Sequence, residues 1–287
     1  MKKRKSPAIE INEMFRKALD VMEHSNKHIF ITGRAGTGKS TLLDYFRKTT
    51  RKKIAVLAPT GVAALNVQGQ TIHSFCRFKP DVTLDKVRKI SKKKESLYKK
   101  FDAIVIDEIS MVRADLLDCV EKFMHLNGRN PKKWFGGMQM VFIGDLYQLP
   151  PVVTSSEKDI FTTQYETPYF FSSHVFNSPA FDMEFVELDK IYRQTEEDFI
   201  YLLNAIRNRS ATDEDIARLN QNYNPHFIPP DDDFYIYLTS TNDLAYIRNQ
   251  EKLQNLSGKI FRYQGLLEGE FKRSYLPTDE VLELKVV

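Results

Sequence analysis

The sequence predicts an α/β protein whose mainly parallel β-sheet is covered by helices on both faces. Short apolar runs alternate along the chain with segments of helical spacing, which is typical of parallel strands joined by helices. Several runs are apolar at successive positions, as expected for strands that are buried on both faces. Glycine-rich or acidic residues follow these runs, and ligands gather at the carboxyl ends of parallel strands.

The first half of the chain supplies the elements of this sheet. The predicted strands are residues 28–32, 53–58, 103–106 and 140–143. The predicted helices are residues 12–22, 41–46 and 116–124, because their apolar residues recur with helical spacing. Pro59 directly follows the second strand and ends it.

A second alternation of elements begins after residue 193. Helices are predicted at residues 199–206, 213–219 and 242–256, and a strand at residues 234–238. Prolines and acidic residues between positions 224 and 233 predict a surface loop. Short strands at residues 260–263 and 281–287 indicate a small β element.

The bulk properties limit the class of protein. The 287 residues, 42% hydrophobic and 28% charged, suffice for two soluble globular domains. No apolar run approaches the ~18 residues of a membrane span, so we expect no membrane association. The basic first five residues are not followed by an apolar core, which argues against secretion. Cys76 and Cys119 lack zinc spacing, so we expect reduced thiols and a cytoplasmic location, nucleoid-associated in a bacterium.

Basic residues concentrate between positions 86 and 100, although the net charge of the chain is only +4. Eight lysines and arginines in this stretch accompany a single acid, Glu95. Such a run either contacts phosphates or forms the solvated face of a surface helix, and the sequence leaves both alternatives open.

A glycine-rich loop follows the first predicted strand and ends in Gly38-Lys39-Ser40. Residues 33–40 fit the P-loop pattern G-x-x-x-x-G-K-S/T, in which the lysine reaches the β- and γ-phosphates and the hydroxyl binds Mg²⁺. Its glycines permit positive φ, so successive N–H groups can face a polyphosphate at the start of the next helix. The loop predicts a nucleoside-triphosphate site. Its predicted binding residues are Gly36, Thr37, Gly38, Lys39, Ser40 and Thr41.

Two acids, Asp107 and Glu108, end the third predicted strand. A carboxylate beside a P-loop strand can hold Mg²⁺, and its neighbour can orient or deprotonate the attacking water. We therefore assign Asp107 to the metal, with Ser40, and Glu108 to the base. The alternative is that Asp107 caps a helix starting near Met111.

Two polar side chains are further candidates for catalysis. Gln148 follows the fourth predicted strand, where its amide can sense a γ-phosphate, but it can equally be a polar loop residue. Arg193 lies near the junction of the two halves. An arginine presented across a cleft can neutralise charge on the γ-phosphoryl group, although a surface arginine has the same sequence pattern.

Small, hydroxyl and aromatic residues follow the second predicted strand, at positions 59–64 and 70–75. Such residues suit phosphate contacts, and His73 or Phe75 can stack on a base. The alternative is a loop in which Phe75 belongs to the core and His73 makes one hydrogen bond.

Six segments in this order resemble motifs I, Ia, Ib, II, III and IV of a superfamily 1 helicase. They are residues 33–40, 58–64, 69–75, 105–111, 144–152 and 188–194. Ala-Pro-Thr-Gly-Val-Ala-Ala, Thr-Ile-His-Ser-Phe and Gly-Asp-x-x-Gln-Leu-Pro-Pro-Val are similar to the petite-integration-frequency (PIF) helicases. These are relatives of RecD that move 5′ to 3′ on single-stranded DNA, and residues 111–120 also resemble their signature helix.

The resemblance implies a domain organisation. Residues 1–190 would form a P-loop RecA-like ATPase domain, 1A, with a small 1B insertion at about residues 76–101. Residues 191–258 would start a second RecA-like domain, 2A, and residues 259–287 would start an SH3-like 2B insertion. The implied activity is an ATP-dependent DNA helicase that acts on single-stranded DNA and at fork or duplex junctions as a monomer, with roles in DNA repair and telomere maintenance.

The resemblance also implies the roles of individual residues, with ATP and Mg²⁺ as cofactors. The ATPase residues carried over are Lys39, Ser40, Asp107, Glu108, Gln148 and Arg193. Tyr192 would pack on the adenine. The DNA contacts carried over are Pro59, Thr60, Gly61, His73, Phe75 and Asn242.

Two departures from the family pattern stand out. Phe15 occupies the position where the family carries a glutamine that reads adenine, and Asn12 is the nearest substitute. Residues 1–287 also contain no motif V and no arginine-bearing motif VI. We therefore expect a fragment of a longer helicase, with impaired hydrolysis on its own; the alternative function is a nucleotide-switched single-stranded-DNA-binding module that does not translocate.

Overall fold

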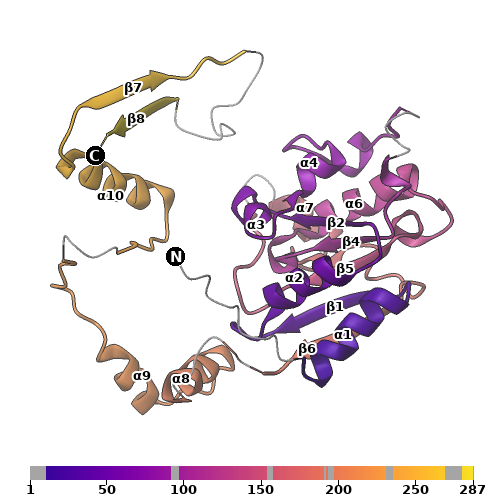
Figure 1. The fold of residues 1–287 in the computed structure, drawn as a ribbon, viewed down its shortest axis with the longest axis horizontal. Coiled ribbons are helices and arrows are strands. Elements are labelled where there is room, and N and C mark those ends of the chain that lie inside the picture. Colours follow the sequence, from indigo (N-terminus) through magenta and orange to yellow (C-terminus); the bar gives the residue numbers. More distant parts are fainter. Residues whose placement is uncertain are drawn as a thin grey trace. The chain divides into compact units, whose positions relative to one another are not determined.

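A computed structural model describes residues 11–91, 97–153, 158–190, 192, 197–230, 235–268 and 280–286. The chain divides into two compact units, Met1–Thr212 and Asp213–Val287 (Figure 1). The predicted domain boundaries at residues 190 and 258 stay predictions.

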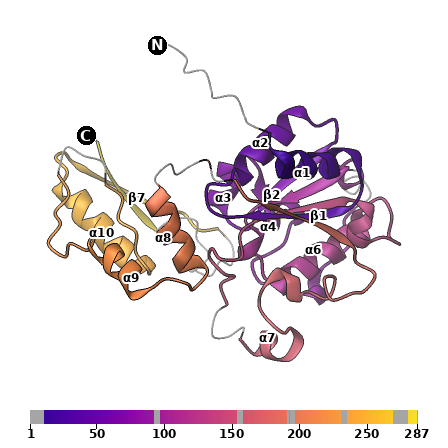
Figure 2. The ribbon, with the colours of Figure 1, turned by 90° about the horizontal axis from the view of Figure 1, so that it is seen from below.

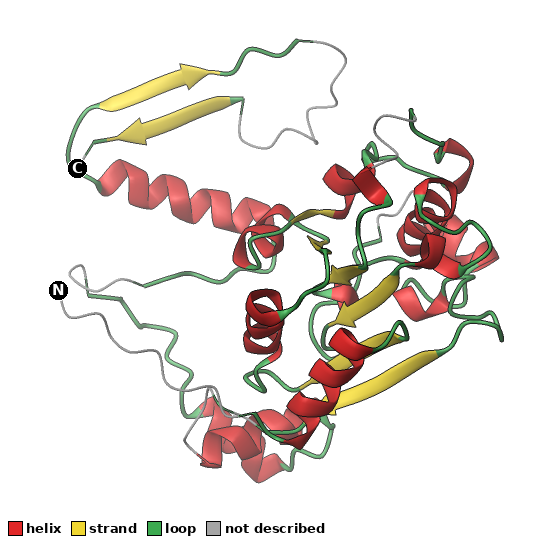
Figure 3. Ribbon diagram, turned by 45° about the vertical axis from the view of Figure 1, so that its right-hand side comes forward, coloured by secondary structure: helices red, strands yellow, loops and turns green. Residues whose placement is uncertain are grey.

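The first unit is built on a six-stranded sheet in the order β3-β2-β4-β5-β1-β6. Figure 3 shows strands of this sheet in yellow with helices beside them in red. Each neighbouring pair of strands is parallel, so all of the strands end at the same edge. The strands are β1 (His28–Gly33), β2 (Ile54–Ala58), β3 (Gln70–Thr71), β4 (Ala103–Ile106), β5 (Gln139–Ile143) and β6 (Met183–Leu188). The predicted α/β class is confirmed.

Helices cover both faces of this sheet: Figure 2 shows α1 and α2 on one side and α6 on the other. The α-helices of the first unit are α1 (Glu13–His24), α2 (Lys39–Thr49), α3 (Gly61–Asn66), α4 (Ile72–Cys76), α6 (Ala114–Asn127), α7 (Lys158–Gln164) and α8 (Glu197–Arg207). Short 3₁₀ turns lie at Leu84–Lys86, Ile109–Met111, Trp134–Gly137 and Phe170–Ser172.

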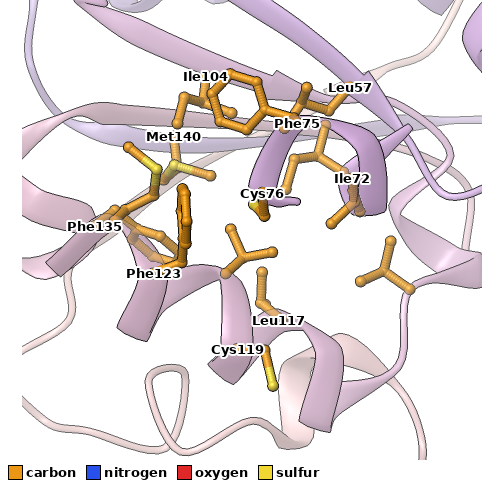
Figure 4. Close-up of a cluster of buried hydrophobic side chains, with 14 of the residues drawn as sticks. Leu57, Ile72, Phe75, Cys76, Ile104, Leu117, Cys119, Phe123, Phe135 and Met140 are labelled. Atoms are coloured by element: carbon orange, nitrogen blue, oxygen red, sulfur yellow. The ribbon is translucent and has the colours of Figure 1, made fainter. Parts of the chain in front are cut away.

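Successive residues of a strand place their side chains in two separate hydrophobic clusters, one on each face of the sheet. Ile29 and Ile31 of β1 pack in the cluster beneath α1 and α2, whereas Phe30 packs in the cluster beneath α4 and α6. This alternation follows from the two-residue period of a strand. Figure 4 shows part of the second cluster, where side chains of α4 and α6 meet those of the strands. Both faces of the sheet are therefore buried at β1, β2, β4 and β5, which explains why these strands are mainly apolar.

Two strands were not predicted from the sequence. β6 contains two acids, Glu184 and Glu187, among its apolar residues and lies at the edge of the sheet, paired along its whole length with β1. Only one of its faces is well buried: Val186 is 1% exposed, whereas Phe185 is 54% exposed. β3 has two residues, pairs with the end of β2 and leads directly into α4.

The second unit contains α9 (Asp213–Asn220), α10 (Asn242–Asn255) and an antiparallel pair, β7 (Ile260–Gln264) and β8 (Val281–Lys285). The predicted strand at residues 234–238 is wrong over its described part, since residues 235–238 form no strand. A strand needs a neighbour to accept its backbone hydrogen bonds, and the described residues supply none there. Leu238 is accordingly 94% exposed.

Among the described residues, no helix is both long enough and apolar enough to cross a membrane.

Candidate nucleotide-binding site

The glycine-rich loop joins β1 to α2 at the carboxyl edge of the sheet. Gly36 and Gly38 have φ values of +81° and +91°, and Gly38 is the N-cap of α2. Positive φ turns backbone N–H groups toward one side of the loop, while the first turn of α2 leaves further N–H groups without a helical partner. The local structure therefore has the amide donors that a polyphosphate requires.

Gly33, the last residue of β1, allows the start of the loop to pack closely against Leu188 of β6. A Cβ atom on Gly33 would lie 2.6 Å from the carbonyl oxygen of Leu188 and 2.6 Å from Oγ1 of Thr37. Thr37 is itself 1% exposed, and its hydroxyl donates to the carbonyl of Arg34 at 2.8 Å. The close approach fixes the first turn of the loop, so only glycine fits at position 33.

Lys39 lies along the loop, where Nζ donates to the carbonyls of Gly33 at 2.6 Å and Arg34 at 3.2 Å. Burial lowers the pKa of Lys39, although the nearby carboxylates of Asp145 and Glu108 oppose this change. A phosphate group, with its stronger negative charge, would compete for Nζ with these neutral carbonyl acceptors.

Most of the predicted nucleotide-binding residues line one cavity of about 340 Å³. Its walls come from the P-loop, from the end of β4 and from the segments after β5 and β6. The lining residues are Ala35, Gly36, Gly38, Lys39, Ser40, Thr41, Glu108, Gln148 and Tyr192. The fold thus brings together residues up to about 150 positions apart in the sequence, as expected for the carboxyl ends of parallel strands.

Asp107 and Glu108 follow β4 directly. Burial, together with the neighbouring Glu108, raises the pKa of Asp107 to about 6, against the attraction of Lys39. The capping alternative for Asp107 is wrong, because the N-cap of the next 3₁₀ turn is Glu108, which makes no side-chain cap. Glu108 has a φ of +52°, an uncommon conformation for a non-glycine residue that is found at functional sites.

The donor atoms at this edge fit Mg²⁺. The Ser40 hydroxyl and the Asp107 carboxylate are oxygen ligands, which Mg²⁺ prefers, and this ion completes its shell with waters and substrate phosphates. The described residues contain no group of three or more His, Cys, Asp or Glu side chains placed to hold a metal by themselves. One protein carboxylate and one hydroxyl agree with a metal that arrives with a nucleotide.

Gln148 lies in a turn whose geometry is set by Asp145. The Gln148 N–H donates to the Asp145 carbonyl at 3.0 Å, and its side-chain Nε2 donates to Asp145 Oδ2 at 3.2 Å. Asp145 also forms an ion pair of 2.7 Å with Arg207 of α8. Neither Asp145 nor Arg207 was among the predicted site residues, and Arg207 lies 62 positions further along the chain.

Tyr192 packs on the outside of the loop. Its N–H donates to the Gly36 carbonyl at 2.8 Å, and its ring would lie 3.6 Å from a Cβ atom on Gly38. The placement suits a ring that covers one side of a bound nucleotide. Arg193, predicted to act in catalysis, lies outside the described residues.

The structure shows what replaces the glutamine near α1. Phe15 is 1% exposed and belongs to the core under α1 and α2. Asn12 caps α1, with Oδ1 accepting from the Phe15 N–H at 2.8 Å. The oxygen of Asn12 is therefore engaged in the cap.

The segments predicted to contact DNA follow β2 at the same edge. Thr60 is the N-cap of α3, where Oγ1 accepts from the Ala63 N–H at 3.2 Å, and Pro59 precedes it. Gly61 opens onto free space, since no atom lies within 4 Å of the position that a Cβ atom would take there. His73 is partly buried, which lowers its pKa.

Two further candidates lie elsewhere. Phe75 is 5% exposed and packs edge-on against Tyr98 at 5.1 Å, so the structure favours the core alternative over base stacking. Asn242 starts α10 in the second unit.

In the basic run of residues 86–100, the structure shows a 3₁₀ turn ending at Lys86, which pairs with Asp81 at 2.7 Å. Residues 87–91 are not helical, and residues 92–96 lie outside the described part.

The fold agrees with comparisons to known proteins. The family model described as PIF1-like helicase matches residues 8–216. The chain belongs to the PIF1-like helicase family. Within this family it is 31% identical to the ATP-dependent DNA helicase RRM3 of Saccharomyces cerevisiae over 299 aligned positions, which cover 98% of this chain and 39% of RRM3.

Solved PIF1-family structures match nearly the whole chain. Pif1 helicase from Bacteroides in complex with ADP-AlF3 and single-stranded DNA is 32% identical, with a TM-score of 0.83 over 97% of this chain and 65% of that one. A structure of DNA unwinding at forked double-stranded DNA by two coordinating Pif1 helicases is 34% identical, with a TM-score of 0.82 over 97% and 66% of the two chains. This PIF1-like chain thus spans about 40% of RRM3 and two thirds of the solved relatives.

Proposed function

We propose that this PIF1-like chain carries the ATP-binding half of a DNA helicase that moves 5′ to 3′ along single-stranded DNA. The observation that carries the proposal is the single cavity lined by the P-loop, Lys39, Glu108 and Gln148. The solved relative with ADP-AlF3 and single-stranded DNA supports both ligands.

Each residue at the site has a proposed role. The amides of residues 36–41 hold the phosphates, and Lys39 offsets their charge. Ser40 and Asp107 would hold Mg²⁺, which neutralises phosphate charge when it is bound. Glu108 takes the proton of the attacking water, and Gln148 orients that water.

Two other residues are proposed to complete the nucleotide site. Arg193 stabilises charge that develops on the γ-phosphoryl group. Tyr192 covers the base, because its ring already lies against the loop at Gly38. Since the oxygen of Asn12 is engaged in a helix cap, we propose that stacking contributes more to base binding than hydrogen bonding does.

The proposed DNA contacts lie at the carboxyl edge of the sheet. Pro59, Thr60, Gly61 and His73 follow β2 and would contact the sugar–phosphate backbone. Asn242, in the second unit, is a separate proposed contact. Single-stranded DNA and forks are the proposed substrates. We further propose that the protein acts as a monomer in the cytoplasm, at the nucleoid if it is bacterial.

The test is ATP turnover with and without a single-stranded oligonucleotide, measured on a chain that includes motifs V and VI as well as on residues 1–287. Stimulation by the oligonucleotide is expected, and Lys39→Ala should abolish turnover because the phosphate charge is no longer offset. Lys48→Ala is the matched control, since Lys48 lies on the same helix but pairs with Asp44 on the surface. Normal turnover by Lys39→Ala would exclude the mechanism. Nucleotide-dependent DNA binding without turnover would instead indicate the switched binding module.

A further inference from the structure

A buried acid beside the candidate site is shared by two side chains. Asp145 follows β5 and is 1% exposed. Its Oδ2 accepts from Arg207 Nη1 at 2.7 Å and from Gln148 Nε2 at 3.2 Å, while Oδ1 accepts from the Tyr147 N–H at 3.1 Å. One carboxylate oxygen therefore connects α8 to the residue proposed to orient the attacking water.

Arg207 is held in place by a second contact. Its guanidinium carbon lies 4.1 Å from the centroid of the Tyr147 ring, and its side chain is 16% exposed. A planar guanidinium can stack its face on a ring while its edge binds a carboxylate, whereas an ammonium group has no planar face to stack. The orientation of Arg207 is thus fixed by two neighbours from one turn.

The end of α8 and the P-loop line one further cavity. This cavity, of about 400 Å³, is bounded by Arg34 and Ala35 of the P-loop, by Gln148, and by Leu203 and Arg207 of α8. All of these residues belong to the first compact unit. The charge on Arg207 therefore acts within reach of the loop proposed to bind phosphate.

The charges in this region compete for the same partners. Asp145 attracts Lys39, whereas Arg207 repels it. Burial raises the pKa of Asp145, but the hydrogen bonds from Arg207 and from the Tyr147 N–H outweigh burial and lower it. With Arg207 paired to it, Asp145 remains ionised and its charge is neutralised locally. Without Arg207, the Asp145 carboxylate would interact more strongly with Lys39 and Gln148, which are its remaining partners.

We propose that Arg207 is a positioning residue for γ-phosphate recognition. By neutralising Asp145, it weakens the attraction of this acid for Lys39 and Gln148, so that both can bind the terminal phosphate of a nucleoside triphosphate. The proposal rests on the proposed function of the site. It makes Arg207 a determinant of the preference for triphosphate over diphosphate, although Arg207 itself need not touch the nucleotide.

The test measures equilibrium binding of fluorescent ADP and of a fluorescent, non-hydrolysable ATP analogue to the full chain. Arg207→Ala should lower affinity for the ATP analogue on the order of tenfold, the equivalent of one charge-assisted hydrogen bond. Affinity for ADP should change little, because the β-phosphate is held by the loop amides. Arg207→Lys keeps the charge but loses the stack, so its effect should be intermediate.

Asp145→Asn shows whether Arg207 acts through this acid. In the Asp145→Asn background, Arg207→Ala should have no further effect on the ratio of the two affinities. The matched control is Arg129→Ala, which removes an ion pair of the same 2.7 Å length, to Asp102, at the opposite edge of the sheet. It should leave the ratio unchanged.

The outcomes separate the two proposals. A wild-type chain that binds no triphosphate would overturn the proposed function itself. A wild-type preference for the ATP analogue that survives in Arg207→Ala would overturn only the role of Arg207. If Arg207→Ala does not fold by circular dichroism, Arg207→Lys decides, and an unchanged ratio in that variant would overturn the proposal.

Discussion

His28, the first residue of β1, links this strand to the start of β5 through its side chain. Its Nδ1 accepts a hydrogen bond from the Met140 N–H at 3.0 Å, and its ring stacks on Phe181 at 4.9 Å. Burial lowers the pKa of His28 to about 4. The imidazole is therefore neutral at physiological pH, as its acceptor role requires.

Acid should weaken the fold through this residue. Between about pH 6.5 and pH 4 the unfolded chain binds a proton at His28 that the folded chain does not. The contribution of His28 is thus complete above about pH 7.5 and falls by about 3 kcal/mol as the pH drops to 4. His28→Asn keeps an acceptor without titrating, so urea unfolding at several pH values should show a flatter profile. Parallel profiles for the two proteins would contradict this role.

Substitution of Gly33 tests whether the close packing at the start of the loop contributes to stability. Gly33→Ala should destabilise the fold by about 2 kcal/mol, because its Cβ would meet the Leu188 carbonyl and the Thr37 hydroxyl. Thermal unfolding measures the loss, and Gly61→Ala is the control, since nothing lies within 4 Å of that position. Equal melting temperatures for Gly33→Ala and the wild type would show that the loop relaxes freely.

The sequence identified those site residues whose chemistry is local. The P-loop was recognisable because its spacing is short and continuous, and Asp107 and Glu108 because they end an apolar run. Arg207 was not recognisable: its meaning depends on a contact with Asp145, 62 positions away, that only the folded chain creates. For Phe75, the choice between core and DNA contact depended on burial, which the local sequence does not determine.

At the scale of elements, α6 anchors the segment between α7 and β6. Asp118 on α6 is 5% exposed, and its carboxylate accepts from the Tyr165 hydroxyl at 3.0 Å and from the His174 and Val175 N–H groups at 3.0 and 3.3 Å. The Asp118 side chain thus accepts hydrogen bonds from backbone N–H groups of an irregular segment, which have no partner in a helix or sheet.

Asp118→Ala should therefore cost about 3 kcal/mol, because two backbone donors and a hydroxyl lose their partner. Asp118→Asn retains an acceptor and should lose less. Urea unfolding gives the energies, and faster hydrogen exchange at residues 174 and 175 would localise the effect. Asp44→Ala, which removes a surface pair with Lys48, should change stability by less than ~0.5 kcal/mol. An equal loss in both variants would refute the anchoring role.

Elements differed in how well their sequence predicted them. α1, α2 and α6 have a clear helical period and were found, as were the four continuously apolar strands. β6 was missed because two acids, Glu184 and Glu187, interrupt its apolar residues, so it has neither a continuous apolar run nor a regular alternation. The segment at residues 235–238 has strand-like composition, but no described neighbour pairs with it.

For the whole molecule, the proposed DNA contacts predict strong dependence on salt. Raising the salt concentration from about 50 to about 200 mM should lower affinity for a single-stranded oligonucleotide more than tenfold, because phosphate contacts release counterions. Fluorescence anisotropy of a labelled oligonucleotide measures this slope. Lys39→Ala should keep the same slope, since Lys39 belongs to the nucleotide site. Affinity indifferent to salt would argue against binding through phosphates.

The cluster beneath α4 and α6 contains both cysteines of the chain, labelled in Figure 4, and both residues are buried. Burial raises the pKa of both thiols, that of Cys119 to about 12. An alkylating reagent can thus reach them only when this side of the sheet opens. The rate of alkylation consequently reports how often the helices on this face separate from the sheet, so the two cysteines are built-in probes of that motion.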